Sequence, residues 1–164
     1  MLKIRAATLD DLKEITEIYN YAIKNTVATF DTDEKTFDEQ IKWFESHGSK
    51  NPIIVAELND EIVAWAALSQ YSTRLAYSDT AEISVYVKEK HQGKGFGRKL
   101  IEEIVKEGEK AGLHVLLARI TDGNNISIHL HESVGFIHIG VLKEVGFKFG
   151  KCLDVYLMQK VYKK

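Results

Sequence analysis

The stretch that decides the fold of this chain is residues 85–98, which read Val85-Tyr86-Val87-Lys88-Glu89-Lys90-His91-Gln92-Gly93-Lys94-Gly95-Phe96-Gly97-Arg98. Its first residues have the β-branched character of a strand, and its last residues begin an amphipathic helix that extends to about Lys110. Three alternate glycines lie between them. Because glycine has no Cβ, backbone amides there can approach an anion closely, and the helix N-terminus adds unpaired N–H groups and about half a positive charge. The stretch therefore predicts a phosphate or pyrophosphate site, beside which Lys94 and Arg98 add positive charge.

The spacing of these glycines excludes two common phosphate loops. A P-loop requires Gly-Lys-Ser/Thr after four intervening residues, and the sequence contains no such string. The dinucleotide fingerprint is Gly-x-Gly-x-x-Gly near the start of a βαβ unit, whereas this chain has Gly-x-Gly-x-Gly in its second half. A plain flexible turn is the simplest alternative. A strand, a glycine loop and a helix in direct succession favour the anion site over that alternative.

Hydrophobic patterns on both sides of this stretch predict strands and helices that share one sheet. Thr8 is the expected N-cap of a first helix, and Thr36 with Glu39 has the spacing of a capping box before a second. A third helix follows the glycines, and a fourth runs from about Asn125 to Gly135. Strands are expected at residues 3–7, 53–58, 61–69, 80–88, 115–120, 136–141 and 153–159. This order predicts an α/β (α+β) domain with a mixed sheet and helices on both faces.

Composition indicates one globular domain that spans residues 1–164. Hydrophobic residues make up 45% of the chain and charged residues 28%, and the net charge of −2 leaves no basic footprint for nucleic acid. The apolar run Ile62–Leu68 is too short to cross a bilayer, and residues 1–5 lack the apolar core of a secretory signal. Cys152 is the only cysteine. We therefore expect a cytoplasmic protein that binds neither nucleic acid nor a membrane.

The segment Gln92–Gly97 matches the Gln/Arg-x-x-Gly-x-Gly/Ala signature of the GNAT superfamily of N-acetyltransferases. Further blocks, in the same order along the chain, resemble the branch that acetylates phosphinothricin and methionine sulfone: Ile4–Thr8, Ala81–Val87, Leu130–Glu132 followed by Gly135-Phe136, and Gly150 with Asp154-Val155 and Gln159. The resemblance implies a mostly antiparallel central sheet and a homodimer. It also implies acetyl transfer from acetyl-CoA to the α-amine of a small amino acid or analogue, of the methionine sulfone, methionine sulfoximine or phosphinothricin type.

The resemblance also implies which residues hold acetyl-CoA. The pyrophosphate would lie on the amides of Gly93, Lys94, Gly95, Phe96, Gly97 and Arg98, and the pantetheine arm would pair with Val85, Tyr86 and Val87 as an added strand would. Asn124 falls where the superfamily has an asparagine that contacts this arm. No metal is expected, because His129 and His131 are two residues apart and so lie on different faces of a helix.

Two side chains are candidates for proton transfer. The α-amine of an amino acid is mostly protonated at pH 7, and a placed general base contributes a factor of about 10²–10⁴. Glu82, on the strand before the glycines, stands where the family has a glutamate in that role, although an exposed strand carboxylate is the simpler interpretation from sequence. His131 replaces the tyrosine that many superfamily members use as an acid for the departing thiolate. Three roles are compatible with His131: it protonates the thiolate, it donates a hydrogen bond within the site, or it only packs against the loop. The sequence does not choose among them, so the general acid is not identified.

The acceptor pocket is expected near Arg74 and Tyr77, which match an Arg-x-x-Tyr of the family's substrate loop. A planar guanidinium binds a carboxylate through two hydrogen bonds, which suits a free amino acid. Phe30, Tyr71 and Tyr77 are candidates for the wall of that pocket, or are ordinary core residues. The family often builds the segment Lys143–Lys151 into the site across a dimer.

Two other functions are compatible with this pattern. An acetyltransferase acting on a protein or peptide N-terminus would have little use for an arginine that binds a free carboxylate, so Arg74 favours the small amino acid. A non-catalytic acyl-CoA-binding module would bind the carrier without turnover, and Glu82 argues against it.

Overall fold

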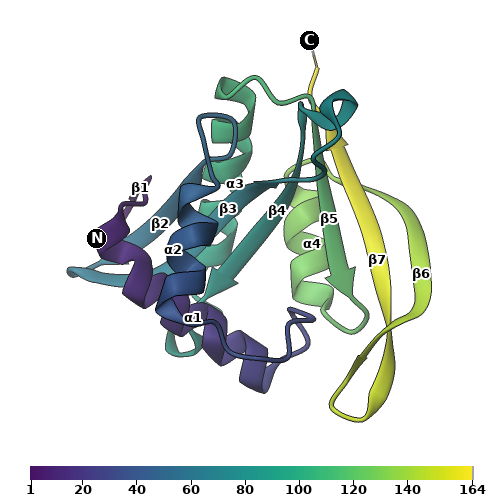
Figure 1. Cartoon of the computed structure of the whole chain (residues 1–164), viewed down its shortest axis with the longest axis horizontal. Helices are drawn as coiled ribbons and strands as arrows, with labels where there is room; N and C mark the ends of the chain where they lie inside the picture. Colours follow the sequence, from purple (N-terminus) through teal and green to yellow (C-terminus); the bar gives the residue numbers. More distant parts are fainter. Residues whose placement is uncertain (164) are drawn as a thin grey trace.

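The computed structural model describes residues 1–163, which form a sheet with helices packed on both of its faces (Figure 1). In chain order the elements are β1 (Leu2–Ala6), α1 (Leu12–Asn25), α2 (Phe37–Glu45), β2 (Ile53–Leu58), β3 (Glu61–Gln70), β4 (Thr80–Val87), α3 (Phe96–Lys110), β5 (Val115–Thr121), α4 (Asn125–Ser133), β6 (Ile137–Lys148) and β7 (Lys151–Val161). Short 3-10 turns lie at Leu9–Asp11, Leu75–Tyr77 and Glu89–His91. The predicted order of elements is confirmed. No helix in the described part of the chain is long and apolar enough to cross a membrane.

The strands within residues 1–163 follow the order β1-β2-β3-β4-β5-β7-β6. β4 and β5 run parallel, and the other neighbouring pairs are antiparallel, which confirms the predicted mixed sheet. Strand side chains alternate between the faces. Trp65 of β3 packs in a cluster with Ile15 and Ile18 of α1, whereas Ala66 and Leu68 belong to the cluster under α3. Thus α1 and α2 cover one face and α3 and α4 the other, as Figure 1 shows.

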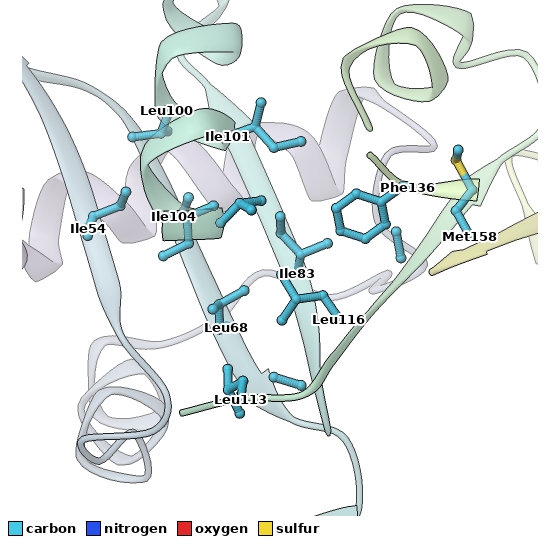
Figure 2. Close-up of a cluster of buried hydrophobic side chains, with 14 of the residues drawn as sticks. Ile54, Leu68, Ile83, Leu100, Ile101, Ile104, Leu113, Leu116, Phe136 and Met158 are labelled. Carbon is cyan, nitrogen blue, oxygen red and sulfur yellow. The ribbon is translucent and has the colours of Figure 1, made fainter. Parts of the chain in front are cut away.

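The larger core cluster lies between α3 and the sheet. Leu100, Ile101 and Ile104 of α3 are fully buried, as their helical spacing predicts. Figure 2 shows them above Leu68 and Ile83, which rise from the strands below. Burying a side chain of this size contributes about 1.5–3 kcal/mol, so the stripe fixes α3 firmly against the sheet. Because α3 is fixed, its N-terminus is held directly beyond the end of β4.

The first helix begins three residues later than the Thr8 cap predicts. Leu9–Asp11 forms a 3-10 turn, and α1 starts at Leu12. The Asp11 carboxylate accepts a hydrogen bond from the Thr8 amide at 2.8 Å and pairs with Arg5 at 2.7 Å, which lowers the pKa of Asp11. These contacts between the end of β1 and the turn favour a tighter 3-10 turn immediately before the α-helix.

The last two strands are much longer than the sequence predicts. They pair as a hairpin from Ile137 to Val161 around a two-residue turn at Phe149 and Gly150, which have φ of 53° and 78°. A turn with two positive φ angles is usually signalled by Asn-Gly or Asp-Gly, and Phe-Gly lacks that signal. The segment Lys143–Lys151, which the resemblance links to the site across a dimer, therefore forms the tip of the hairpin, and Figure 1 shows this tip projecting beyond the rest of the sheet.

Candidate active site

The glycine loop forms a cradle of unpaired backbone amides. Gly93 and Gly95 have φ of 76° and 82°, in the left-handed region where glycine is unstrained. Gln92 anchors the loop, because its side-chain Nε2 donates to the carbonyl of Val87 at 3.1 Å. Within residues 1–163, no group accepts a hydrogen bond from the six amides of residues 93–98. These N–H groups and the N-terminus of α3 together have the geometry that suits an anion.

β4 and β5 separate directly in front of this loop. They pair only over Thr80–Glu82 and Val115–Leu117, and beyond these residues the strands diverge (Figure 1). β3 occupies the other edge of β4 along its whole length. The edge of β4 at residues 85–87 therefore faces the separation instead of a partner strand and is open to an extended ligand, except that the Val87 carbonyl already accepts from Gln92.

A cavity of about 900 Å³ joins the glycine loop to the separated strands. The residues predicted to hold acetyl-CoA line it, with the exception of Lys94: Val85, Tyr86, Val87, Gly93, Gly95, Phe96, Gly97, Arg98 and Asn124. His131 lines it as well. The cavity therefore combines the glycine loop and the edge of β4 in one site, and its volume is within the usual range of ligand pockets.

Glu82 lies at the last paired position of β4, where the two strands separate. Both oxygens of its carboxylate accept hydrogen bonds from one edge of the Arg119 guanidinium. Nε donates to Oε2 at 3.0 Å, and Nη2 donates to Oε1. The Glu82 side chain is a quarter exposed and that of Arg119 is more than half exposed. These hydrogen bonds raise the pKa of Arg119, so its guanidinium stays charged at the mouth of the separation.

The predicted acceptor residues lie outside the cavity lining. Arg74 is exposed just before the turn Leu75–Tyr77, and its guanidinium has no partner among residues 1–163. The rings of Tyr71 and Tyr77 meet edge to face at 5.2 Å, and both are partly exposed. Phe30 packs directly against Gly146 of β6. The structure thus brings the two tyrosines together, whereas no contact joins Arg74 to Glu82.

His131 is buried in α4 with one ring nitrogen already committed. Its Nδ1 donates to the carbonyl of Ser127 at 2.7 Å, and its ring meets Phe136 edge to face. Burial lowers the pKa of His131, so the imidazole is neutral at neutral pH with Nε2 unprotonated. Asn124 caps the same helix, because its Oδ1 accepts from the Ser127 amide at 3.3 Å. Its Nδ2 donates to no residue that the structure describes and is available to a ligand.

The comparison with known proteins agrees with this geometry. A family model described as an acetyltransferase (GNAT) domain matches residues 4–157. The chain belongs to the GNAT acetyltransferase family. The predicted family and the predicted type of fold are both confirmed.

Several named relatives of this GNAT chain act on amino acids. It is 38% identical to the L-amino acid N-acyltransferase MnaT of Escherichia coli K12, over 96% of this chain and 92% of that one. It is 37% identical to the L-methionine sulfoximine/L-methionine sulfone acetyltransferase of Salmonella typhimurium, over 96% and 93%. It is 34% identical to the phosphinothricin N-acetyltransferase of Streptomyces coelicolor, over 94% and 92%.

A solved structure agrees with the fold of this GNAT chain over its whole length. The acetyltransferase yncA of Salmonella typhimurium, determined with its cofactor acetyl-CoA, superimposes with a TM-score of 0.96. The two chains are 36% identical, and the match covers 100% of this chain and 95% of the other.

Two features of this GNAT site were not predicted from the sequence. One is Arg119, which carries no motif; only the pairing of Glu82 with Leu117 shows that residue 119 lies on the same face as Glu82. The other is the segment of residues 26–29, whose first three residues line the cavity and whose four carbonyls all accept hydrogen bonds from strand side chains. Lys148 donates to the carbonyls of Thr26 and Thr29, both at 2.8 Å. Thr121 donates to the carbonyl of Val27 at 2.7 Å, and Tyr86 to that of Ala28 at 3.4 Å. Burial lowers the pKa of Lys148.

Proposed function

We propose that this protein transfers the acetyl group of acetyl-CoA to the α-amine of a small amino acid or analogue, of the methionine sulfone, methionine sulfoximine or phosphinothricin type. In this proposal residues 1–164 act as one N-acetyltransferase domain. The observation that carries it is the continuity of the six unpaired amides with the free edge of β4 in one cavity. The activities of the amino acid-acylating relatives support the choice of acceptor.

Different residues of the chain bind the successive parts of acetyl-CoA in this proposal. The amides of residues 93–98 donate to the pyrophosphate, and each charge-assisted hydrogen bond contributes about 1.5–3 kcal/mol. Arg98 adds a positive charge beside them, and the free edge of residues 85–87 pairs with the amide groups of the pantetheine arm. The Nδ2 of Asn124 donates to the same arm. Acetyl-CoA supplies a thioester carbonyl that an amine can attack.

Glu82 is the proposed general base. It lies where β4 and β5 separate, with a carboxylate that is partly exposed and therefore open to an incoming ammonium group. It accepts the proton that the α-amine must lose before attack, directly or through water. His131 would have to be protonated at Nε2 to act as the acid, and its lowered pKa makes that form scarce at neutral pH. The departing thiolate is a fair leaving group, and we assign its protonation to solvent.

Arg74 is the proposed ligand of the acceptor's carboxylate, because its exposed guanidinium has no partner within the described residues. Arg74→Ala should raise the KM for L-methionine sulfone about 10- to 100-fold, the loss of one charge-assisted contact, and leave the acetyl-CoA KM unchanged. Steady-state kinetics with the amino acid and with its carboxamide measure this effect. An equal loss on the carboxamide would show that Arg74 does not bind the carboxylate.

The proposed homodimer places a second copy against β6. This edge strand exposes a row of large apolar side chains, which a monomer rarely leaves uncovered: Ile137, Ile139, Val141, Val145 and Phe147. The wild-type chain should have twice its monomer mass in light scattering at micromolar concentration. Ile139→Lys, which puts a charge in the middle of this row, should shift the mass towards the monomer. A wild-type mass of one chain would contradict the dimer.

We place the enzyme in the cytoplasm and expect its partner to be a small-molecule amine. The thiol of Cys152 is exposed and unpaired, which suits a reducing compartment. The net charge of −2 gives nucleic acid no basic surface to bind.

The proposed reaction is tested by a panel of acceptors. Purified protein is incubated with acetyl-CoA and free amino acids, their oxidised derivatives, or short peptides, and the released CoA thiol is measured. The proposal expects turnover with free amino acids, the oxidised methionine derivatives among the best. Turnover with peptides alone would favour a protein N-terminal acetyltransferase, and acetyl-CoA binding without turnover would favour a non-catalytic module.

A further inference from the structure

Arg119 uses only one of its two hydrogen-bonding edges in this structure. The edge formed by Nε and Nη2 is occupied by Glu82. Of the residues that the structure describes, Glu82 is the one that accepts hydrogen bonds from Arg119, so the Nη1 side of the guanidinium is unused. The side chain is 57% exposed, and a ligand can therefore reach this side. A guanidinium has five N–H donors in a rigid plane, and a second carboxylate can bind at the second edge.

The position of Arg119 relates this free edge to the reaction. Arg119 is two residues beyond Leu117, the last residue of β5 that pairs with β4, and its side chain reaches across the separation to Glu82. The rings of Tyr71 and Tyr77 lie together at the end of β3, which pairs with β4 at Glu82. Arg119 thus contacts the proposed base from the side of β5, and Tyr71 follows the strand on its other side.

The spacing of the two edges matches an α-amino acid. Acceptors on the two hydrogens of one guanidinium nitrogen lie about 5 Å apart, because each is about 2.9 Å from the nitrogen and the N–H bonds diverge by about 120°. The amine of an α-amino acid lies about 3 Å from its own carboxylate oxygens. When one oxygen of that carboxylate accepts from the second hydrogen of Nη2, the amine can lie between this oxygen and the Glu82 carboxylate, within hydrogen-bond distance of both.

We propose that Arg119 is a specificity-determining residue that binds the acceptor's α-carboxylate on its free edge while its other edge holds Glu82, so that the α-amine lies beside the base. This inference rests on the proposed amino acid acetyltransferase activity and on Glu82 as its base. It differs from the role proposed for Arg74, which contacts no part of Glu82. Arg74 affects how tightly the acceptor binds, whereas Arg119 also affects where the amine lies relative to the base.

The pair is not needed for the stability of the fold. Glu82 and Arg119 are both partly exposed, and an ion pair of this kind contributes little to folding stability. Arg119→Gln should therefore fold as the wild type does. Arg119→Lys keeps the charge but has a single ammonium group, which cannot present two edges in one plane. The two variants together separate charge from geometry.

The experiment compares kcat/KM for L-methionine sulfone and for its carboxamide, which keeps the amine and lacks the charged carboxylate. Arg119→Gln should lower kcat/KM for the acid about 100-fold, in kcat as well as in KM, and for the carboxamide less than about 5-fold. Arg119→Lys should recover part of the loss on the acid. The KM for acetyl-CoA should be unchanged in both. Lys110→Gln, which removes an exposed ion pair with Glu107 on α3, is the matched control and should behave as the wild type.

The outcomes separate this inference from the activity on which it rests. If the wild type acetylates L-methionine sulfone and Arg119→Gln loses equal activity on acid and carboxamide, Arg119 only positions Glu82 and the inference is overturned. The same conclusion follows if the acid-to-carboxamide preference stays within about 3-fold of the wild type. If the wild type binds acetyl-CoA but acetylates no free amino acid, the proposed function fails and the inference falls with it.

Discussion

Replacing Glu82 with Gln should lower kcat/KM for the amino acid at pH 7 by about 100- to 10,000-fold, the usual contribution of a general base. Glutamine keeps the shape of the side chain and can still hydrogen-bond to Arg119, but it cannot accept a proton. At pH 9 to 10 the acceptor amine loses its proton without help, so the deficit of the variant should shrink steadily as the pH rises. A pH profile of kcat/KM for wild type and variant measures this convergence.

The matched control for this variant is Glu107→Gln, which also removes an exposed carboxylate from an ion pair, the one with Lys110 on α3. It should keep the wild-type profile. Neither change should cost more than about 1 kcal/mol of folding free energy, because both pairs are solvent-exposed. Full activity of Glu82→Gln at pH 7 would remove Glu82 from the mechanism.

Replacing Gly95 with Val should weaken acetyl-CoA binding about 100-fold or more. Gly95 is the N-cap of α3 with φ of 82°, a conformation that a β-branched residue adopts only under strain. A valine would relax the loop away from this conformation and shield its amides, and the loss of two charge-assisted hydrogen bonds accounts for the expected change. Calorimetric titration with acetyl-CoA measures the dissociation constant.

Gly112→Val separates the binding effect from backbone strain. Gly112 follows the other end of α3 with φ of 84°, and like Gly95 it has open space where a Cβ would lie. Both variants should lose about 1–2 kcal/mol of folding free energy, seen as similar shifts in thermal unfolding. Only Gly95→Val should lose acetyl-CoA affinity. Equal affinities in the two variants would mean that the glycine loop is not the pyrophosphate site.

The parts of the fold that follow from local sequence were predicted well. The succession of strand, glycine loop and helix at residues 85–98 and the buried stripe from Leu100 to Val105 depend on near neighbours in the chain, and the structure has both. The lengths of β6 and β7 were not predicted, because register shifts and a Phe-Gly turn interrupt the alternation that marks a strand.

The missed parts of the site depend on contacts between residues far apart in the chain. Arg119 meets Glu82 only because the parallel pairing of β4 with β5 brings residues 37 positions apart together. Lys148 reaches the segment of residues 26–29 from the far end of the sheet order, over more than a hundred residues of sequence. No local pattern encodes either contact, since each requires the register of strands whose pairing is known only after folding.

Because β4 and β5 pair only briefly, the length of β4 also sets the distance between Glu82 and the glycine loop. Glu82 lies near the start of β4 and the cradle at residues 93–98 follows its end, and the strand between them advances about 3.3 Å per residue. One inserted residue between Glu82 and Val85 would turn the carboxylate into the hydrophobic layer under α3, and two would restore its orientation about 6.6 Å too far from the cradle. Insertions and deletions should therefore be tolerated in many loops of this enzyme but not within this segment.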